Sequence, residues 1–246
     1  MIQVNRSTLP NGIRLIHNYD SATAMVALHV SVDAGSADES PERTGLAHLL
    51  EHLMFGGSAN IPDFDGAIEA AGGFNNAYTS TDRTVFYSVA PAQNAETLFW
   101  AESDRILAPS FSEKTLEVQR SVVIEEFKQT CLNRPYGDTT HLLRSMIYKQ
   151  HPYRWPVIGL DPQHIADTTR DDVLQFFDRH YTPANITLVV TGHITWGATV
   201  RLAEKWFGTI PTRTPALRNL PVEPEPESAT EMTVYRNVPS TAITIA

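Results

Sequence analysis

The sequence predicts an α+β fold in which helices cover a β-sheet. Segments with alternating apolar residues, typical of half-buried strands, are interspersed with longer segments of helical periodicity, and one pair of strands is joined by a tight hairpin turn. The chain has 246 residues, of which 42% are hydrophobic and 19% charged, as in an ordinary folded globular protein. That length allows one large domain or two small ones.

The first segments of the chain are expected to be strands. Residues 2–9 and 12–17 are predicted to pair across a turn at Asn11-Gly12, a dipeptide that favours tight hairpins. Residues 25–34 alternate apolar with small or polar side chains, as a half-buried strand does. A polar loop over residues 35–44 then leads into the first helix.

The remaining elements follow from periodicity, β-branched content and capping residues. Two extended segments are expected within residues 75–89, and a buried strand is expected over residues 186–192. Helices are expected over residues 46–55, 61–71, 92–107, 112–129, 139–148, 162–167, 170–180 and 196–207.

Composition changes after Ile210. Residues 211–230 are rich in proline and lack apolar periodicity, which predicts a linker. Residues 231–246 alternate again as a strand would, and the chain stops within that pattern. We therefore expect residues 1–210 to form one domain and residues 231–246 to begin a second domain that is mostly absent.

Net charge, cysteine content and the absence of long apolar runs limit the partners, cross-links and location that we expect for this protein. A formal net charge of -9 repels phosphate backbones, so we expect no nucleic-acid partner. The single cysteine, Cys131, excludes an internal disulfide and is expected to be a core residue. The sequence contains neither a signal peptide nor an apolar run of about 18 residues, which predicts a cytoplasmic protein without a membrane partner. A chain trimmed of a signal peptide would look the same.

The strongest functional signal lies between Gly45 and Gly57. The only polar side chains there are His48, Glu51 and His52, and at about 100° per residue all three share one stripe of an otherwise apolar helix. Burying two imidazoles and a carboxylate costs free energy unless partners bind these polar groups. A divalent metal is such a partner, because imidazoles at i and i+4 can both reach one ion. The alternative is that both histidines are core residues whose ring nitrogens are hydrogen-bonded within the protein. The presence of two histidines and a glutamate on one stripe disfavours that alternative.

A catalytic zinc site usually takes three protein ligands, so an acid from another element is expected. Residues 112–129 offer two, Glu125 and Glu126. Helical periodicity places Glu126 beside the core face of that helix and Glu125 nearly opposite. Glu126 is therefore the better ligand candidate, although periodicity alone also allows both acids to be solvated.

The segment HLLEH at residues 48–52, followed by VVIEE at residues 122–126, resembles the inverzincin zinc metallopeptidases. This is the family of pitrilysin, insulin-degrading enzyme and mitochondrial processing peptidase, and the likeness is to its N-terminal, zinc-binding half. The resemblance covers the whole of residues 1–210 and includes the segments GGFNNAYT (72–79), YTPAN (181–185) and WFGTIP (206–211). It implies a processing-peptidase-like metallohydrolase domain with a mixed, largely antiparallel sheet.

The resemblance also implies roles for individual residues. His48, His52 and Glu126 would bind Zn2+, and Glu51 would be the catalytic base that takes a proton from metal-activated water. Many relatives carry a glutamate where this chain has Gln119, which weakens the case for an acid at that position.

Substrate contacts are implied on the segment that opens with Asn75. In the resembling family this strand edges the active-site cavity and pairs with substrate backbone, which maps to Asn76 and Ala77 as substrate-binding residues. The alternative is an ordinary sheet strand with a turn asparagine.

The function expected from these features is that of a zinc-dependent endopeptidase acting on extended peptides or unfolded segments. The alternative is a non-catalytic, peptide-presenting subunit of a two-subunit processing peptidase; a non-peptidase zinc hydrolase is a weaker third reading. The family pattern implies a second homologous domain, on the same chain or on a partner subunit in a dimer, that contributes an Arg-Tyr pair. Residues 1–246 alone are thus expected to bind zinc and to cleave peptides poorly.

Overall fold

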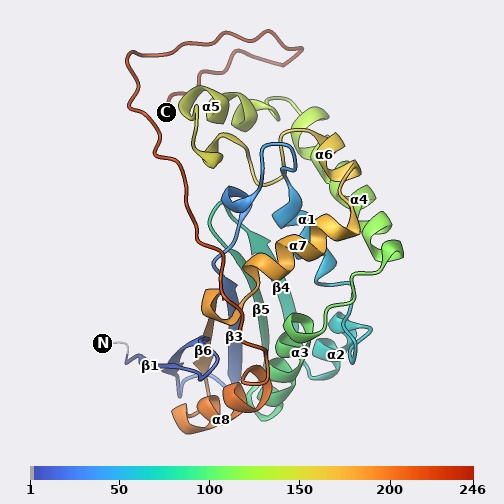
Figure 1. Ribbon diagram of the computed structural model, residues 1–246, viewed down its shortest axis with the longest axis vertical. Coiled ribbons are helices and arrows are strands. Elements are labelled where there is room, and N and C mark those ends of the chain that lie inside the picture. The colour runs from blue at the N-terminus through green and yellow to red at the C-terminus, as the bar shows by residue number, and fades with distance from the viewer. Residues whose placement is uncertain (1–2) are drawn as a thin grey trace.

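Six strands form one sheet in the order β1-β2-β6-β3-β5-β4 in the computed structural model, which describes residues 3–246 (Figure 1). The strands are β1 (Asn5–Thr8), β2 (Arg14–Tyr19), β3 (Met25–Val32), β4 (Phe74–Thr79), β5 (Thr84–Pro91) and β6 (Ile186–Gly192). Strands β2 and β6 are parallel, and the other neighbouring pairs are antiparallel. The predicted α+β class with a mixed, largely antiparallel sheet is confirmed.

The hairpin that begins the chain forms around the predicted turn. Gly12 has a φ of +101°, a conformation that glycine adopts without strain. The Asn11 side chain donates hydrogen bonds to the carbonyls of Phe207 and Ile210 at 2.8 and 3.1 Å. The turn is thereby fixed to the end of the last helix. Ile2, where the first strand was expected to start, lies outside the described residues.

The sheet has one core face. In β3, Val26, Leu28, Val30 and Val32 are fully buried, whereas the residues between them are half-buried. Strand β6 shows the same alternation. Because successive strand residues point to opposite faces, the main core lies between one face of the sheet and the helices packed on it.

Eight α-helices accompany the sheet in the described chain, and α1 and α7 lie across it in Figure 1. They are α1 (Leu46–Leu53), α2 (Phe64–Ala70), α3 (Ala95–Leu107), α4 (Glu113–Phe127), α5 (Thr139–Ile147), α6 (Pro162–Ala166), α7 (Arg170–His180) and α8 (Trp196–Phe207). The bounds predicted for α7, β6 and α8 agree with the structure. Among the described residues, no helix combines the length and apolarity needed to cross a bilayer.

Six of the eight described helices differ from expectation at an end. Helices α1, α5 and α6 end one or two residues early, and α2, α3 and α4 differ as follows. Helix α2 begins at Phe64 rather than residue 61, because the Asp63 side chain caps it by accepting a hydrogen bond from the Gly66 amide. A 3-10 turn (Ala92–Asn94) precedes α3. Helix α4 ends at Phe127 and continues as a π-helical turn (Lys128–Leu132).

Residues 211–246 are described without a helix or strand, so the strand-like segment expected at the end of the chain is not formed. An alternating apolar and polar sequence does not form a strand by itself, because a strand needs a neighbouring strand to pair with. The segment is nevertheless attached to the domain: Arg218 forms ion pairs with Asp38 and Asp82, each at 3.0 Å, and Arg236 pairs with Asp138 at 2.9 Å. The division into residues 1–210, 211–230 and 231–246 stays a prediction.

Candidate metal centre

Helix α1, which carries the predicted histidines, is buried along its apolar residues. Its apolar residues are at most 6% exposed, whereas His48 and His52 are half-buried. The first turn of the helix is held by Glu39, whose carboxylate accepts hydrogen bonds from the amides of Gly45 (2.9 Å) and Ala47 (2.8 Å). A carboxylate there binds unpaired amides and complements the helix dipole.

Sequence reasoning missed Glu39. Its only local signal is an acid shortly before a helix start, and many surface acids share that feature.

Helix α4 packs against α1 through the face that periodicity predicted. Leu116, Val123 and Phe127 are buried in the core. Glu125 is exposed and pairs with Lys128 at 2.5 Å, whereas Glu126 lies beside the core face. Glu126 is therefore the acid that α4 directs toward α1.

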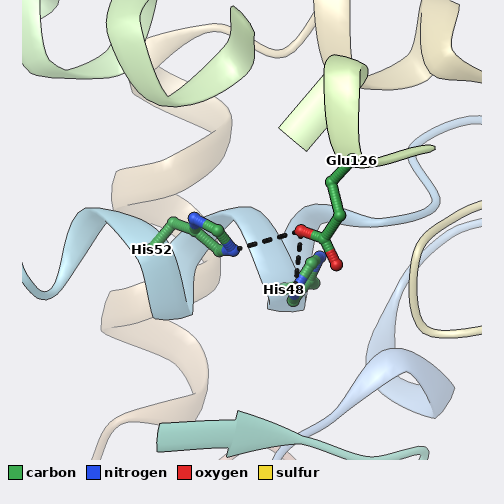
Figure 2. A group of neighbouring side chains, drawn as sticks. All are labelled: His48, His52 and Glu126. Carbon is green, nitrogen blue, oxygen red and sulfur yellow. Dashed lines mark ion pairs between the residues drawn. The ribbon is translucent and has the colours of Figure 1, made fainter. Parts of the chain in front are cut away.

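The two histidines and Glu126 converge on one point (Figure 2). Glu126 Oε2 lies 3.8 Å from His48 Nε2 and 3.6 Å from His52 Nε2, and one donor atom from each residue lies within 4.8 Å of the other two. Both separations exceed ordinary hydrogen-bond lengths of about 2.7–3.2 Å. Two ligands of a tetrahedral zinc ion, each about 2.0–2.1 Å from it, lie roughly 3.4 Å apart.

The donor set fits zinc in chemistry as well as in spacing. Two imidazoles and one carboxylate are a ligand set of catalytic zinc sites, which keep a fourth position open for water or substrate. Within residues 3–246, this is the one group of at least three histidine, cysteine or acidic side chains whose donor atoms converge in this way.

The imidazoles are held in a form suited to metal binding. Burial, followed by the neighbouring His52, lowers the pKa of His48 to about 4, so its ring is neutral at physiological pH. A neutral imidazole has a lone pair for a metal. On His52, Nδ1 lies 3.3 Å from Gln119 Oε1. An amide oxygen there accepts the Nδ1 proton and leaves Nε2 facing Glu126, a positioning role open to Gln119 without an acid.

Glu51 lies on α1 next to these donors but is not one of the three that converge. Its side chain is buried, and its Oε2 accepts a hydrogen bond from the Thr79 hydroxyl at 2.5 Å. Burial raises the pKa of Glu51; the Thr79 hydrogen bond and His52 oppose that shift, and Glu126 adds to it. The result is a buried carboxylate beside the candidate metal ligands, as expected for a base distinct from them.

Strand β4, which contains Asn76 and Ala77, is an edge strand. It pairs with β5 on one side, and no described strand pairs with its other side. The Ala77 amide donates a hydrogen bond to the Asn76 side chain at 2.8 Å. An open edge of this kind can accept an extended peptide as an added strand. The roles of Asn76 and Ala77 in substrate binding stay a prediction.

Comparison with known protein families identifies the family of this chain. The model described as "Insulinase (Peptidase family M16)" matches residues 14–159, which include all the candidate metal ligands. The chain belongs to the M16 insulinase family. A second model, "Peptidase M16 inactive domain", matches residues 167–246.

Individual M16 relatives cover most of this chain. It is 29% identical over 209 residues to the uncharacterized zinc protease YmxG of Bacillus subtilis, covering 84% of this chain and 50% of the relative. It is also 29% identical over 209 residues to mitochondrial-processing peptidase subunit beta of Caenorhabditis elegans, covering 83% of this chain and 44% of the relative. The chain thus spans about half the length of these curated M16 relatives.

Solved structures of M16-like proteases share the fold. A protease from Helicobacter pylori has a TM-score of 0.86 at 26% identity, covering 92% of this chain and 55% of that one. The first half of the periplasmic protease PqqL from Escherichia coli has a TM-score of 0.80 at 25% identity, covering 90% and 48%. The predicted family is confirmed. Relatives of this chain from Bacillus subtilis and Mycobacterium leprae are named zinc proteases, which implies zinc as the metal of those proteins.

Proposed function

We propose that this chain is the zinc-binding half of an endopeptidase that hydrolyses extended peptides or unfolded segments. The observation that carries the proposal is the convergence of donors from α1 and α4 beside a buried carboxylate, Glu51, that is not among them. This arrangement separates metal binding from proton transfer, as metal-assisted peptide hydrolysis requires.

The metal would be held by Nε2 of His48, Nε2 of His52 and a carboxylate oxygen of Glu126. Zinc bound there supplies a Lewis acid that polarises a peptide carbonyl and acidifies water. Glu51 accepts the proton of the attacking water and later gives it to the leaving amine. Its burial favours this role, because a raised pKa brings a carboxylate closer to the working pH.

The substrate would lie along the open edge of β4 as an added strand. Main-chain hydrogen bonds to Asn76 and Ala77 would hold it with little demand on sequence, which selects for extended or unfolded segments. The relatives are about twice as long as this chain, so we also propose that a second homologous domain, on the same chain or in a partner subunit, completes the substrate site. Residues 1–246 alone would then turn over peptides slowly.

The alternative of a non-catalytic, peptide-presenting subunit is less well supported. A chain that only presented peptides would have no need of two partly buried imidazoles beside the buried carboxylate of Glu51, where unmatched polar groups destabilise the fold.

Substitution of Glu51 tests the proposal in the full-length, zinc-loaded protein. Glu51→Gln is expected to retain zinc and to lower cleavage of a fluorogenic extended peptide by roughly 10²–10⁴-fold, the usual contribution of a general base. His48→Ala is expected to lose both zinc and cleavage. Metal analysis and a cleavage assay with and without a chelator distinguish the outcomes. Unchanged turnover in Glu51→Gln would remove Glu51 from the mechanism, and peptide binding without cleavage by the wild type would favour the alternative.

A further inference from the structure

The edge strand β4 reaches the proposed base through its last residue. Thr79 is separated from Glu51 by 28 positions, and the two meet because β4 packs beside α1. The Thr79 hydroxyl lies 2.5 Å from Glu51 Oε2. This contact connects the strand proposed to hold substrate with the residue proposed to move the proton.

The alternation of β4 explains why Thr79 faces the helix. Phe74, Asn76 and Tyr78 are exposed, whereas the intervening residues are half-buried, and Ala77 packs against the main core. Thr79 is on the same face as Ala77, two residues further along. Its side chain is therefore directed at α1 by the pleat of the strand.

The direction of the hydrogen bond follows from the neighbouring hydroxyl. Thr84, which is opposite Thr79 in the β4–β5 ladder, is buried and donates its proton to the Ala34 carbonyl at 3.0 Å. The two threonine hydroxyls are 3.5 Å apart, at the limit of a hydrogen bond. The Thr79 proton is thus directed to Glu51, since a hydroxyl has one proton and an ionised carboxylate can only accept.

Only one oxygen of Glu51 is engaged. Oε2 accepts from Thr79, whereas Oε1 makes no hydrogen bond to any described residue. A carboxylate fixed at one oxygen presents the other in a defined direction, which a freely rotating carboxylate does not.

We propose that Thr79 is a positioning residue for the base: its hydroxyl fixes Glu51 Oε2 and leaves Oε1 directed to receive the proton from water. The inference rests on the proposed function. Because Thr79 is two residues from Ala77, the strand that would bind substrate also orients the base. Binding and proton transfer share a structural element, and Thr79 acts on turnover through Glu51 rather than on affinity.

Two substitutions separate the hydroxyl from the side-chain volume. In the full-length zinc-loaded protein, Thr79→Val keeps the shape and removes the donor, whereas Thr79→Ser keeps the donor. Thr79→Val is expected to lower kcat by about 10–100-fold, as misplacement of a catalytic group does, with KM and zinc content unchanged. Thr79→Ser is expected to retain most of kcat. Thr187→Val is the matched control, because Thr187 is a half-buried threonine of central strand β6 whose hydroxyl accepts from Arg14.

Equal losses in Thr79→Val and Thr79→Ser would overturn the proposal, as would a change confined to KM or an unchanged kcat in Thr79→Val. Crystal structures of both zinc-loaded variants provide a test that needs no activity. The Glu51 carboxylate is expected to rotate in Thr79→Val and to stay in place in Thr79→Ser, and an unmoved carboxylate in Thr79→Val would overturn the proposal. A wild type without chelator-sensitive cleavage would count against the proposed function instead.

Discussion

The core between β5 and α3 contains an ion pair, in which Glu102 Oε2 and Arg105 Nε lie 3.2 Å apart. Between α1 and α4, by contrast, Glu126 lies 3.8 Å from His48 and 3.6 Å from His52, and the three side chains form no hydrogen bonds with one another. Both regions collect polar groups that are costly to bury. They differ in whether the chain itself supplies the neutralising partner.

The partners of the core pair are all internal. Ser88 donates a hydrogen bond to Glu102, and the Arg105 guanidinium lies over the Phe64 ring at 3.5 Å. Arg105 and Glu102 are at most 1% exposed, so no ligand reaches them. Buried charge therefore does not by itself indicate function. Convergence of donors without an internal cation does, because an ion from solution then fits the site.

Among the substitutions that test this difference between the two regions, removal of the Glu126 carboxylate is expected to have the largest effect. Glu126→Ala leaves two imidazoles without the acid, and zinc affinity is expected to fall by more than the roughly 10–100-fold typical of residues that only support a ligand. Competition titration with a chromophoric chelator measures it. Glu125→Ala is the matched control, because Glu125 is exposed and pairs with Lys128. Equal zinc affinity in the two variants would exclude Glu126 as a ligand.

Substitutions in the Glu102–Arg105 ion pair should change the stability of the fold and leave metal binding unchanged. Arg105→Met leaves Glu102 buried without its cation and is expected to lower the free energy of unfolding by about 3–5 kcal/mol. The double variant Glu102→Leu/Arg105→Met is expected to recover most of that loss, since both charges are then gone. Urea denaturation measures both, and folded variants should keep their zinc stoichiometry. A single variant as stable as the wild type would show that the pair is not needed.

Substitution of His180 is expected to have a smaller effect, on how the free energy of unfolding depends on pH. His180 is a buried titratable group without a neutralising partner. Burial, followed by Arg179 and Arg218, lowers its pKa to about 4 from an ordinary value of 6.5. Between those two values the unfolded chain binds a proton that the native chain does not, so stability is lost as pH falls through this window. His180→Gln is expected to reduce the loss by up to about 2 kcal/mol, allowing for partial solvation of the ring.

Chemical denaturation at pH 7 and pH 4.5 tests this, with a chelator present so that protonation of the metal-site histidines does not contribute through lost zinc. The same pH dependence in His180→Gln and in the wild type would show that another group is responsible.

Local periodicity accounts for the parts of the fold that were predicted most closely. Helices α7 and α8 and strand β6 begin and end at the predicted residues, and the core face of α4 is the one predicted from Leu116, Val123 and Phe127. Within a single helix, the 3.6-residue repeat fixes which side chains share a face. The stripe of His48, Glu51 and His52 could be predicted for the same reason.

Contacts between distant segments were decided only by the tertiary structure. Nothing local predicts that Glu39 caps α1, that Gln119 meets His52, or that Thr79 reaches Glu51. Each contact depends on the order of strands in the sheet and on how α4 packs against α1. The sequence alone determined which residues could share one face of α1; only the packing of the whole chain determined which distant side chains, Glu126 among them, lie opposite that face.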